Sequence, residues 1–481
     1  MHKKKIYIAI VIFSILYTAC KVPKLAEKPS VNALPTNFDS TDTLANSQDT
    51  INIAKIKWDQ YFTDPNLVAL IDTALRNNQE LNILRQEIDM SQNEIQERKG
   101  EYLPFVGAKV GAGVEKVGRY TELGALEDNV DIMEGRKMPD PMTDYGLSLN
   151  ARWEIDIWKK LHNATKAAIE NYMASVEGKN FAVTNLIGEI ASSYYELLGL
   201  DNQQKILDQN IAIQANALEV VKAEMMATKT TQLAVKKFEA ELLKTKSLQF
   251  GIQQRIVETE NRINYLLGRY PVHITRVDST FYSPLPSIVH IGIPKQMLDN
   301  RPDIRQAEHE LQASQLNVAV AKAQFYPSLD LSAAVGYSAF NPKYLFYTPK
   351  SLIYSLAGDL VAPLVNKNAI KAQYANANAK QIQAVYNYQR TLVNAYVEVV
   401  NQMNKINNLQ NTYQMQHSQV DLLTQSIDIS NDLFKSSRAD YIEVLTTQRD
   451  ALESTFDLIE TEVAQRLAQI KIYQALGGGW N

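Results

Sequence analysis

The chain is short of cysteine, glycine, proline and net charge, and each shortage excludes a class of protein. Among 481 residues there is one cysteine, which excludes an internal disulfide and any paired-cysteine metal or redox site. The 19 glycines and 16 prolines are too few for a linker-rich or disordered chain. A net charge of −4 gives no electrostatic footprint for nucleic acid. We therefore expect an ordered protein that does not bind nucleic acid.

Long hydrophobic runs and catalytic motifs are also missing. A multi-pass helical membrane protein needs repeated apolar stretches of about 20 residues, and the sequence has none. It lacks the GxSxG, HExxH and P-loop patterns of hydrolases, metalloproteases and nucleotide-binding proteins. No two of its 6 histidines stand three or four residues apart, so a helical pair of metal ligands is absent. We expect no enzyme, no catalytic residue, no metal site and no cofactor.

Residues 1–19 have the features of a signal peptide. Three lysines open the segment, and the apolar run that follows ends at Ala19 and is too short to span a bilayer. The single cysteine, Cys20, comes next. The segment resembles a bacterial lipoprotein signal, although Tyr17 replaces the usual aliphatic residue. We expect an exported chain with a covalent lipid on Cys20. The alternative is an ordinary cleaved signal followed by an incidental cysteine.

The sequence contains an internal duplication. The segment 77–82 matches 300–305, and a second match joins 231–235 to 440–444. A period near 200 residues is too long for a solenoid and indicates a duplicated domain. The predicted divisions are an N-terminal segment at 20–64, a first repeat at 65–267, a proline-rich linker at 268–300, a second repeat at 301–476 and a tail at 477–481.

Four segments alternate strictly between apolar and polar residues: about 105–117, 144–156, 328–338 and 351–361. Alternation over about ten residues indicates a two-faced strand, and that length also suits a tilted membrane strand. One face in lipid and one in water is typical of an outer-membrane barrel, although a soluble sheet covered on one side would alternate similarly. Four strands cannot close a barrel, and lipid does not tolerate open edges. Membrane strands would therefore require several chains.

Most of the remaining sequence predicts long helices. Leu392, Tyr396, Val399 and Met403 follow the 4-3-4 spacing of a coiled coil. Helices near 160–226 and 364–434 would run about 100 Å at 1.5 Å per residue, which no globular core needs. The apolar pattern breaks at 227–232 and 436–441, and we expect a hairpin turn at each place.

Three motifs resemble the TolC-like outer membrane factors, most closely the lipoprotein (NodT-type) branch that serves resistance-nodulation-division efflux pumps. They are the WDQYFTDP sequence at 58–65, Leu266-Leu267-Gly268, and Gly292-Ile293-Pro294 followed by RPDIRQAE at 301–308. The resemblance covers the whole mature chain.

The resemblance implies an α+β membrane protein that forms a homotrimer. Three chains would supply a 12-stranded β-barrel in the outer membrane, continued by a 12-helix coiled-coil α-barrel in the periplasm. The function implied is the passive exit duct of a tripartite efflux system, with a periplasmic adaptor and an inner-membrane pump as partners. The alternatives are the duct of a type I secretion system and a non-conducting trimeric coiled-coil structural lipoprotein.

The resemblance also assigns roles to the hairpin turns. Thr228, Lys229, Ser437 and Arg438 correspond to tips that dock the adaptor. Ser437 stands where the family usually has glycine, and Thr228 is its equivalent in the first repeat.

The same turns would form the periplasmic aperture. Glu443 aligns with an acidic ring position, and a carboxylate ring would favour cations and resist closure; the alternative is a solvated helix-face residue. Asp440, Arg438 and Lys229 are the other candidates. The family's polar lock is absent, because its positions hold Phe434, Ala439 and Ala234. Any gate would rest on the charged candidates or on packing.

Overall fold

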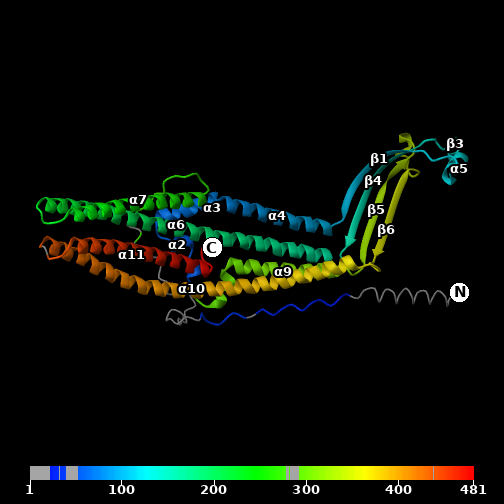
Figure 1. Cartoon of the computed structure of the whole chain (residues 1–481). Coiled ribbons are helices and arrows are strands. Elements are labelled where there is room, and N and C mark those ends of the chain that lie inside the picture. Colours follow the sequence, from blue (N-terminus) through cyan, green and yellow to red (C-terminus); the bar gives the residue numbers. More distant parts are fainter. Residues whose placement is uncertain are drawn as a thin grey trace. The chain divides into compact units, whose positions relative to one another are not determined.

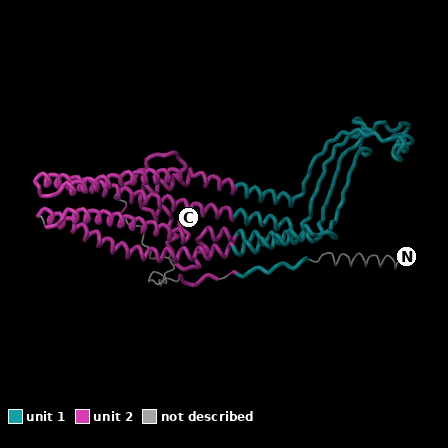
Figure 2. The backbone as a smooth tube through the Cα atoms, in the orientation of Figure 1, with its two compact units in different colours: residues 1–30, 89–173, 309–386 teal, residues 31–88, 174–308, 387–481 magenta. Residues whose placement is uncertain are grey.

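The computed structural model describes residues 22–31, 33–38, 52–277, 281, 292–436 and 438–480. The predicted signal peptide, Cys20 and Ser437 lie outside these residues. The chain divides into two compact units (Figure 2). We call the first the sheet unit; it comprises Asp89–Met173, His309–Tyr386 and the described residues up to Ser30. The second, the hairpin unit, comprises the described parts of Val31–Ile88, Ala174–Glu308 and Asn387–Asn481.

The elements of the two halves follow one another in matching order (Figure 1). The first half contains η2 (Ile53–Lys55), α2 (Trp58–Tyr61), α3 (Pro65–Asn77), α4 (Gln79–Tyr102), β1 (Phe105–Glu115), α5 (Glu122–Asn129), β2 (Asp131–Met133), β3 (Arg136–Lys137), β4 (Met142–Ile155), α6 (Lys160–Met226) and α7 (Gln232–Leu266). The second contains η4 (Pro294–Gln296), α8 (Met297–Asn300), α9 (Pro302–Ala323), β5 (Ser328–Ala339), η5 (Pro342–Tyr344), β6 (Leu352–Val361), α10 (Asn368–Lys435) and α11 (Tyr441–Ala475).

The lengths of the helices confirm the duplication. Helix α6 has 67 residues and α10 has 68, while α7 and α11 have 35 each. The α+β fold is also confirmed. The charged residues of 118–143 predict one long hairpin loop, but in the structure this connection between β1 and β4 carries α5 and the β2–β3 hairpin. These elements are short and exposed, so their local sequence preference was too weak to recognise.

The sheet unit contains one antiparallel sheet with strand order β1-β4-β5-β6. Its register aligns the alternation of all four strands. One row joins Val106 to Ala151, Ala151 to Ala333 and Ala333 to Leu356. A neighbouring row joins Gly107 to Asn150, Asn150 to Ala334 and Ala334 to Ser355. One face is therefore apolar over the whole sheet, and the other carries small and polar residues.

The apolar face of the sheet consists of side chains that a soluble protein would normally bury. Its larger members are Val106, Val110, Val114, Tyr145, Leu147, Leu149, Trp153, Leu329, Leu331, Val335, Tyr337, Tyr354, Leu356 and Leu360. Val110, Tyr354 and Leu356 are each about 80% exposed in the single chain. An exposed apolar surface of this extent marks a contact with lipid or protein.

In the hairpin unit, α6 packs against α11 through two glycines. Gly188 lies directly against Gln474, and Gly199 lies directly against Val463. An added Cβ atom would collide with the facing side chain at both places, so glycine permits this close antiparallel contact. The register continues to a hydrogen bond from Gln203 to Glu460, 3.2 Å long.

The two helical hairpins thus meet along α6 and α11. In the orientation of Figure 1, the part of the bundle in this unit has α7 and α10 on the outside. Tyr61 of α2 stacks on Tyr473 of α11 with ring centroids 4.1 Å apart, and both side chains are buried.

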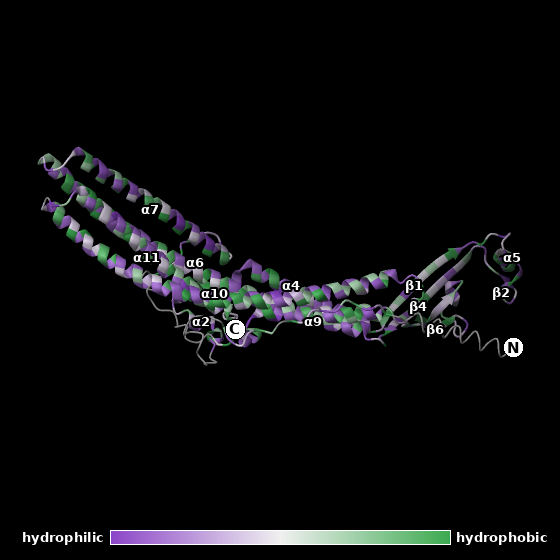
Figure 3. Cartoon of the chain, turned by 60° about the horizontal axis from the view of Figure 1, so that its bottom comes forward, coloured by the Kyte–Doolittle hydropathy of each residue, from purple (hydrophilic) through white to green (hydrophobic). Residues whose placement is uncertain are grey.

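Hydrophobic and hydrophilic residues intermingle along the helices (Figure 3). Within the described residues, no helix combines the length and the apolar character needed to cross a membrane.

Candidate functional site

Most of the residues that the sequence predicts as docking tips and aperture lie at the two helix turns, and Glu443 lies in the first turn of α11. Helix α6 ends at Met226 and α7 begins at Gln232, with Thr228 between them at a φ of 59°. A positive φ is unusual for a β-branched residue. The second turn lies between Lys435 and Tyr441.

The four charged candidates of the turns are all exposed. Among the described residues, no ion pair joins Lys229, Arg438, Asp440 or Glu443 to a partner in the same chain. Asp440 stands at the N-cap of α11, but its side chain accepts no capping hydrogen bond. Within one chain, ion pairs therefore do not hold the two turns together.

An apolar cluster joins the hairpin ends instead. This tip cluster consists of Leu218, Val221, Ala234, Val235, Phe238 and Leu242 from the first hairpin, with Phe434, Tyr441 and Leu445 of the second packed against it. Packing is the alternative to charge that the sequence allows for a gate in this region. Phe434 of α10 thus contributes an apolar contact to the first hairpin.

Two further apolar stripes lie on the outer helices of the hairpin unit. Leu243, Phe250 and Val257 recur every seven residues on α7, and Met415, Leu422 and Ile429 do so on α10. All six side chains are between 49% and 71% exposed. A seven-residue apolar repeat is the pattern of a coiled-coil seam, yet these stripes contact nothing that would bury them in one chain. We call them the α7 stripe and the α10 stripe.

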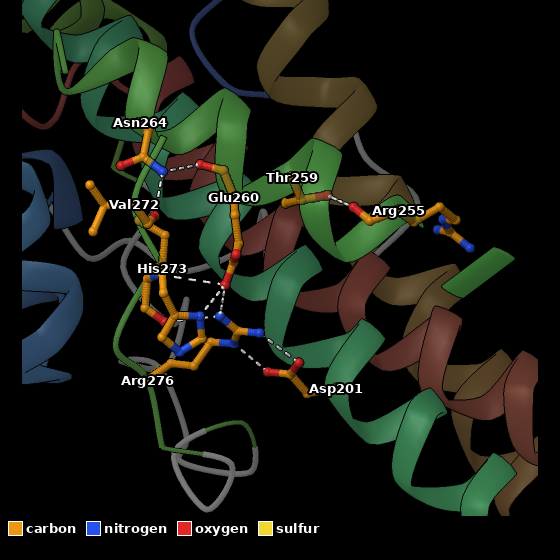
Figure 4. Close-up of polar contacts among 9 residues, drawn as sticks. Asp201, Arg255, Thr259, Glu260, Asn264, Val272, His273 and Arg276 are labelled. Carbon is orange, nitrogen blue, oxygen red and sulfur yellow. Dashed lines mark hydrogen bonds and ion pairs between the residues drawn. The ribbon is translucent and has the colours of Figure 1, made fainter. Parts of the chain in front are cut away.

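A cluster of charges fastens the start of the linker to α6 and α7 (Figure 4). The Arg276 guanidinium donates hydrogen bonds to Asp201 of α6 and Glu260 of α7, including one of 2.8 Å from Nη2 to Asp201 Oδ1. His273 Nδ1 lies 2.9 Å from Glu260 Oε1. Asn264 Nδ2 also donates to the carbonyl of Val272 at 2.6 Å. The segment 271–277 is therefore held across two helices.

The charge balance explains why Arg276 stays ionised. Its side chain is only 9% exposed, and burial alone would lower the pKa of the guanidinium. The hydrogen bonds to Asp201 and Glu260 outweigh burial, so the pKa of Arg276 is raised. The sequence alone does not reveal this cluster, because its members are far apart in the chain and look like ordinary surface charges.

Among the described residues, no three acidic, histidine or cysteine side chains lie close enough together to bind a metal ion. The features that stand out are therefore surfaces: a two-faced sheet with free edges, paired helical hairpins, and apolar stripes on the outer helices.

Known proteins resemble this chain in sequence and fold. The profile of the outer membrane efflux protein family matches residues 70–269 and 293–478. The pyoverdine export outer membrane protein OpmQ of Pseudomonas aeruginosa is 27% identical over 429 residues, covering 88% of this chain and 87% of OpmQ. The cation efflux system protein CusC of Escherichia coli O6:H1 is 25% identical over 470 residues, covering 96% of both.

The fold agrees with these matches. The outer-membrane channel OprN superposes with a TM-score of 0.83 at 21% identity, covering 95% of this chain and 99% of OprN. Fold and sequence together define an efflux protein of the outer membrane. Because the profile spans most of the sequence, the chain belongs to the outer membrane efflux protein family.

We predict that Arg276→Ala releases the segment 271–277. The change leaves Asp201 and Glu260 without their shared cation, and the local opening free energy should fall by about 2–3 kcal/mol. Hydrogen exchange at the Ile274 amide would report the loss. Arg262→Ala is the matched control, because its ion pair with Glu189 is exposed and should contribute below about 1 kcal/mol. Equal acceleration in both variants would contradict a special role for Arg276.

Proposed function

We propose that this protein assembles as a homotrimer and forms the exit duct of a tripartite efflux system. One observation carries the proposal. The two repeats contact each other within the chain, and the duplication gives each of these contacts an equivalent pair of surfaces that has no partner within one chain. The duplication makes β1 the equivalent of β5 and β4 the equivalent of β6. The β4–β5 pairing inside the chain thus corresponds to a pairing of β6 with the β1 of a second copy.

The helices follow the same rule. By the duplication, α10 corresponds to α6 and α7 corresponds to α11. The α6–α11 contact inside the chain therefore corresponds to a contact of α10 with the α7 of the next copy. These are the helices that carry the α10 stripe and the α7 stripe, so the contact would bury both.

The sheet supplies the reason for closure. Its apolar face suits lipid, but an edge strand in lipid would leave backbone N–H and C=O groups without partners, at several kcal/mol each. Pairing β6 with a neighbouring β1 satisfies them. Three copies would give 12 strands, with the small and polar face lining a wet lumen.

Membership of the outer membrane efflux protein family supports the proposed partners and mechanism. A periplasmic adaptor would dock at the turns that contain Thr228, Lys229, Ser437 and Arg438, and an inner-membrane resistance-nodulation-division pump would supply the energy. The duct itself would conduct passively, without catalysis or a cofactor. A secretion duct would share this architecture, whereas a structural lipoprotein would need no two-faced strands.

Single-channel recording tests the duct and its seam. The wild type should assemble as a trimer and pass ions across a planar bilayer. Phe250→Asp combined with Leu422→Asp should abolish assembly and current, because each carboxylate would be buried in an apolar contact. Ile213→Asp with Val220→Asp is the control, since these exposed α6 residues lie outside both stripes. A wild-type trimer without current would reject the duct, and an assembled, conducting stripe variant would reject the seam.

We also propose that Cys20 carries a lipid. Val22 and Leu25 pack against Ala321, Phe325 and Tyr374 in the sheet unit, and Asn378 Nδ2 donates to the Ala26 carbonyl at 3.3 Å. Phe325 lies just before β5 begins. Since two residues span at most about 7 Å, a lipid on Cys20 would enter the membrane beside the strands.

Metabolic labelling with palmitate tests the lipid. The mature wild-type chain should incorporate label and Cys20→Ala should not. The control Tyr17→Leu restores the usual aliphatic residue of such signals and should label at least as well as the wild type. Label retained in Cys20→Ala, or absent from the wild type, would contradict the anchor.

We propose that the Glu443 side chains of three copies form a ring of carboxylates at the periplasmic aperture. The Glu443 side chain is exposed near the start of α11, and three copies would place three carboxylates around the axis and favour cations. Glu443→Gln should move the reversal potential in a KCl gradient towards zero. Glu453→Gln, an exposed carboxylate farther along α11, is the control. An unchanged reversal potential in Glu443→Gln would reject the ring.

A further inference from the structure

Three buried polar residues form one layer across the helices of the hairpin unit. Gln214 of α6 and Gln448 of α11 are each 2% exposed, and Thr245 of α7 is 1% exposed. All three occupy positions where neighbouring turns of the same helices place apolar side chains in the core. Such an interruption of an apolar seam lowers stability locally and specifies register.

The register of the helices brings the three residues together. Helix α6 meets α11 at the Gln203–Glu460 hydrogen bond on one side of the layer, and Leu218 and Leu445 share the tip cluster on the other side. Stepping along both helices between these contacts sets Gln214 opposite Gln448. Leu207 and Ile252 share a cluster on the side of the layer away from the turns, and Leu218 and Leu242 share a cluster on the side towards the turns. That spacing sets Thr245 opposite Gln214.

Hydrogen bonding in this layer is incomplete. The Oε1 atoms of Gln214 and Gln448 are buried and, within the described part of the chain, accept no hydrogen bond. Thr245 Oγ1 donates to the Glu241 carbonyl of its own helix at 3.0 Å, so it ties no helices together. A buried acceptor without a partner costs about 1–3 kcal/mol. The layer is consequently a weak plane between the two apolar clusters that flank it.

Apolar clusters flank the layer on both sides. Towards the turns lies the tip cluster, which joins both hairpins. Away from the turns lies a second cluster, built from Leu200, Leu207, Ile252 and Leu452. Ile211 packs against both clusters, so the apolar core continues past the layer but is thin there. The hairpin ends are thus packed as a module of their own.

We propose that the layer of Gln214, Thr245 and Gln448 is the hinge about which the hairpin ends move as one module. The hinge rests on the proposed duct, whose periplasmic opening these ends would form. Motion concentrates where the fewest favourable contacts are lost. Bending at the layer exposes polar groups that gain water, and it leaves the tip cluster of each hairpin pair intact.

Filling the layer with apolar side chains tests the hinge. Gln214→Leu combined with Gln448→Leu should join the two clusters and cut the open probability of the trimer in planar bilayers by about tenfold, the factor that roughly 1.4 kcal/mol produces. Amide hydrogen exchange in residues 215–244 should slow by a similar factor. The control Gln209→Leu with Gln425→Leu alters exposed glutamines on α6 and α10 and should change neither quantity.

A second variant keeps the test decisive if the double change disturbs folding. Thr245→Val preserves volume and removes the hydroxyl, and it should act in the same direction with a smaller effect. If the wild type conducts and the layer variants conduct equally, the hinge is wrong and the layer only specifies register. If the wild type carries no current, the duct fails, and hydrogen exchange alone decides the hinge: unchanged rates overturn it.

Discussion

The close contact between α6 and α11 is the interaction on which the rest of the structure depends. Gly188 and Gly199 leave room on α6 for the side chains of Gln474 and Val463 of α11, and this contact sets the register of one hairpin against the other. The tip cluster and the alignment of Gln214 with Gln448 both follow from that register. A Cβ at Gly199 would collide with the Val463 side chain and push the helices apart, whereas a Cβ at Gly188 would displace the end of the Gln474 side chain.

The sequence predicted the elements well because their periodicity is strong. Alternation placed four strands, and the register shows that their apolar residues share one face. The hairpin turns were also predictable, because the coiled-coil pattern stops on both sides of each. These signals are local: they depend on residues two to seven positions apart, which is the range that strand and helix geometry controls.

Contacts between distant segments were not predictable in the same way. Arg276 reads as one of many surface arginines until the fold brings it between Asp201 and Glu260. Phe434 reads as a substitution in a polar lock until it packs on the first hairpin. The glutamines of the buried layer read as ordinary breaks in two separate heptad patterns. Only three-dimensional register shows that they share a plane with Thr245.

The duplication has a consequence for the two kinds of junction in the proposed ring. The positions on α10 that correspond to Gly188 and Gly199 hold Val397 and Asn408, both exposed, so the close approach inside a chain cannot be repeated between chains. The ring would alternate three tight junctions with three wider ones. An ancestor half as long could have closed the same ring with six identical junctions. Fusion of two copies allowed the two kinds of contact to diverge. The contacts within each chain could become rigid, while the contacts between chains could remain able to widen.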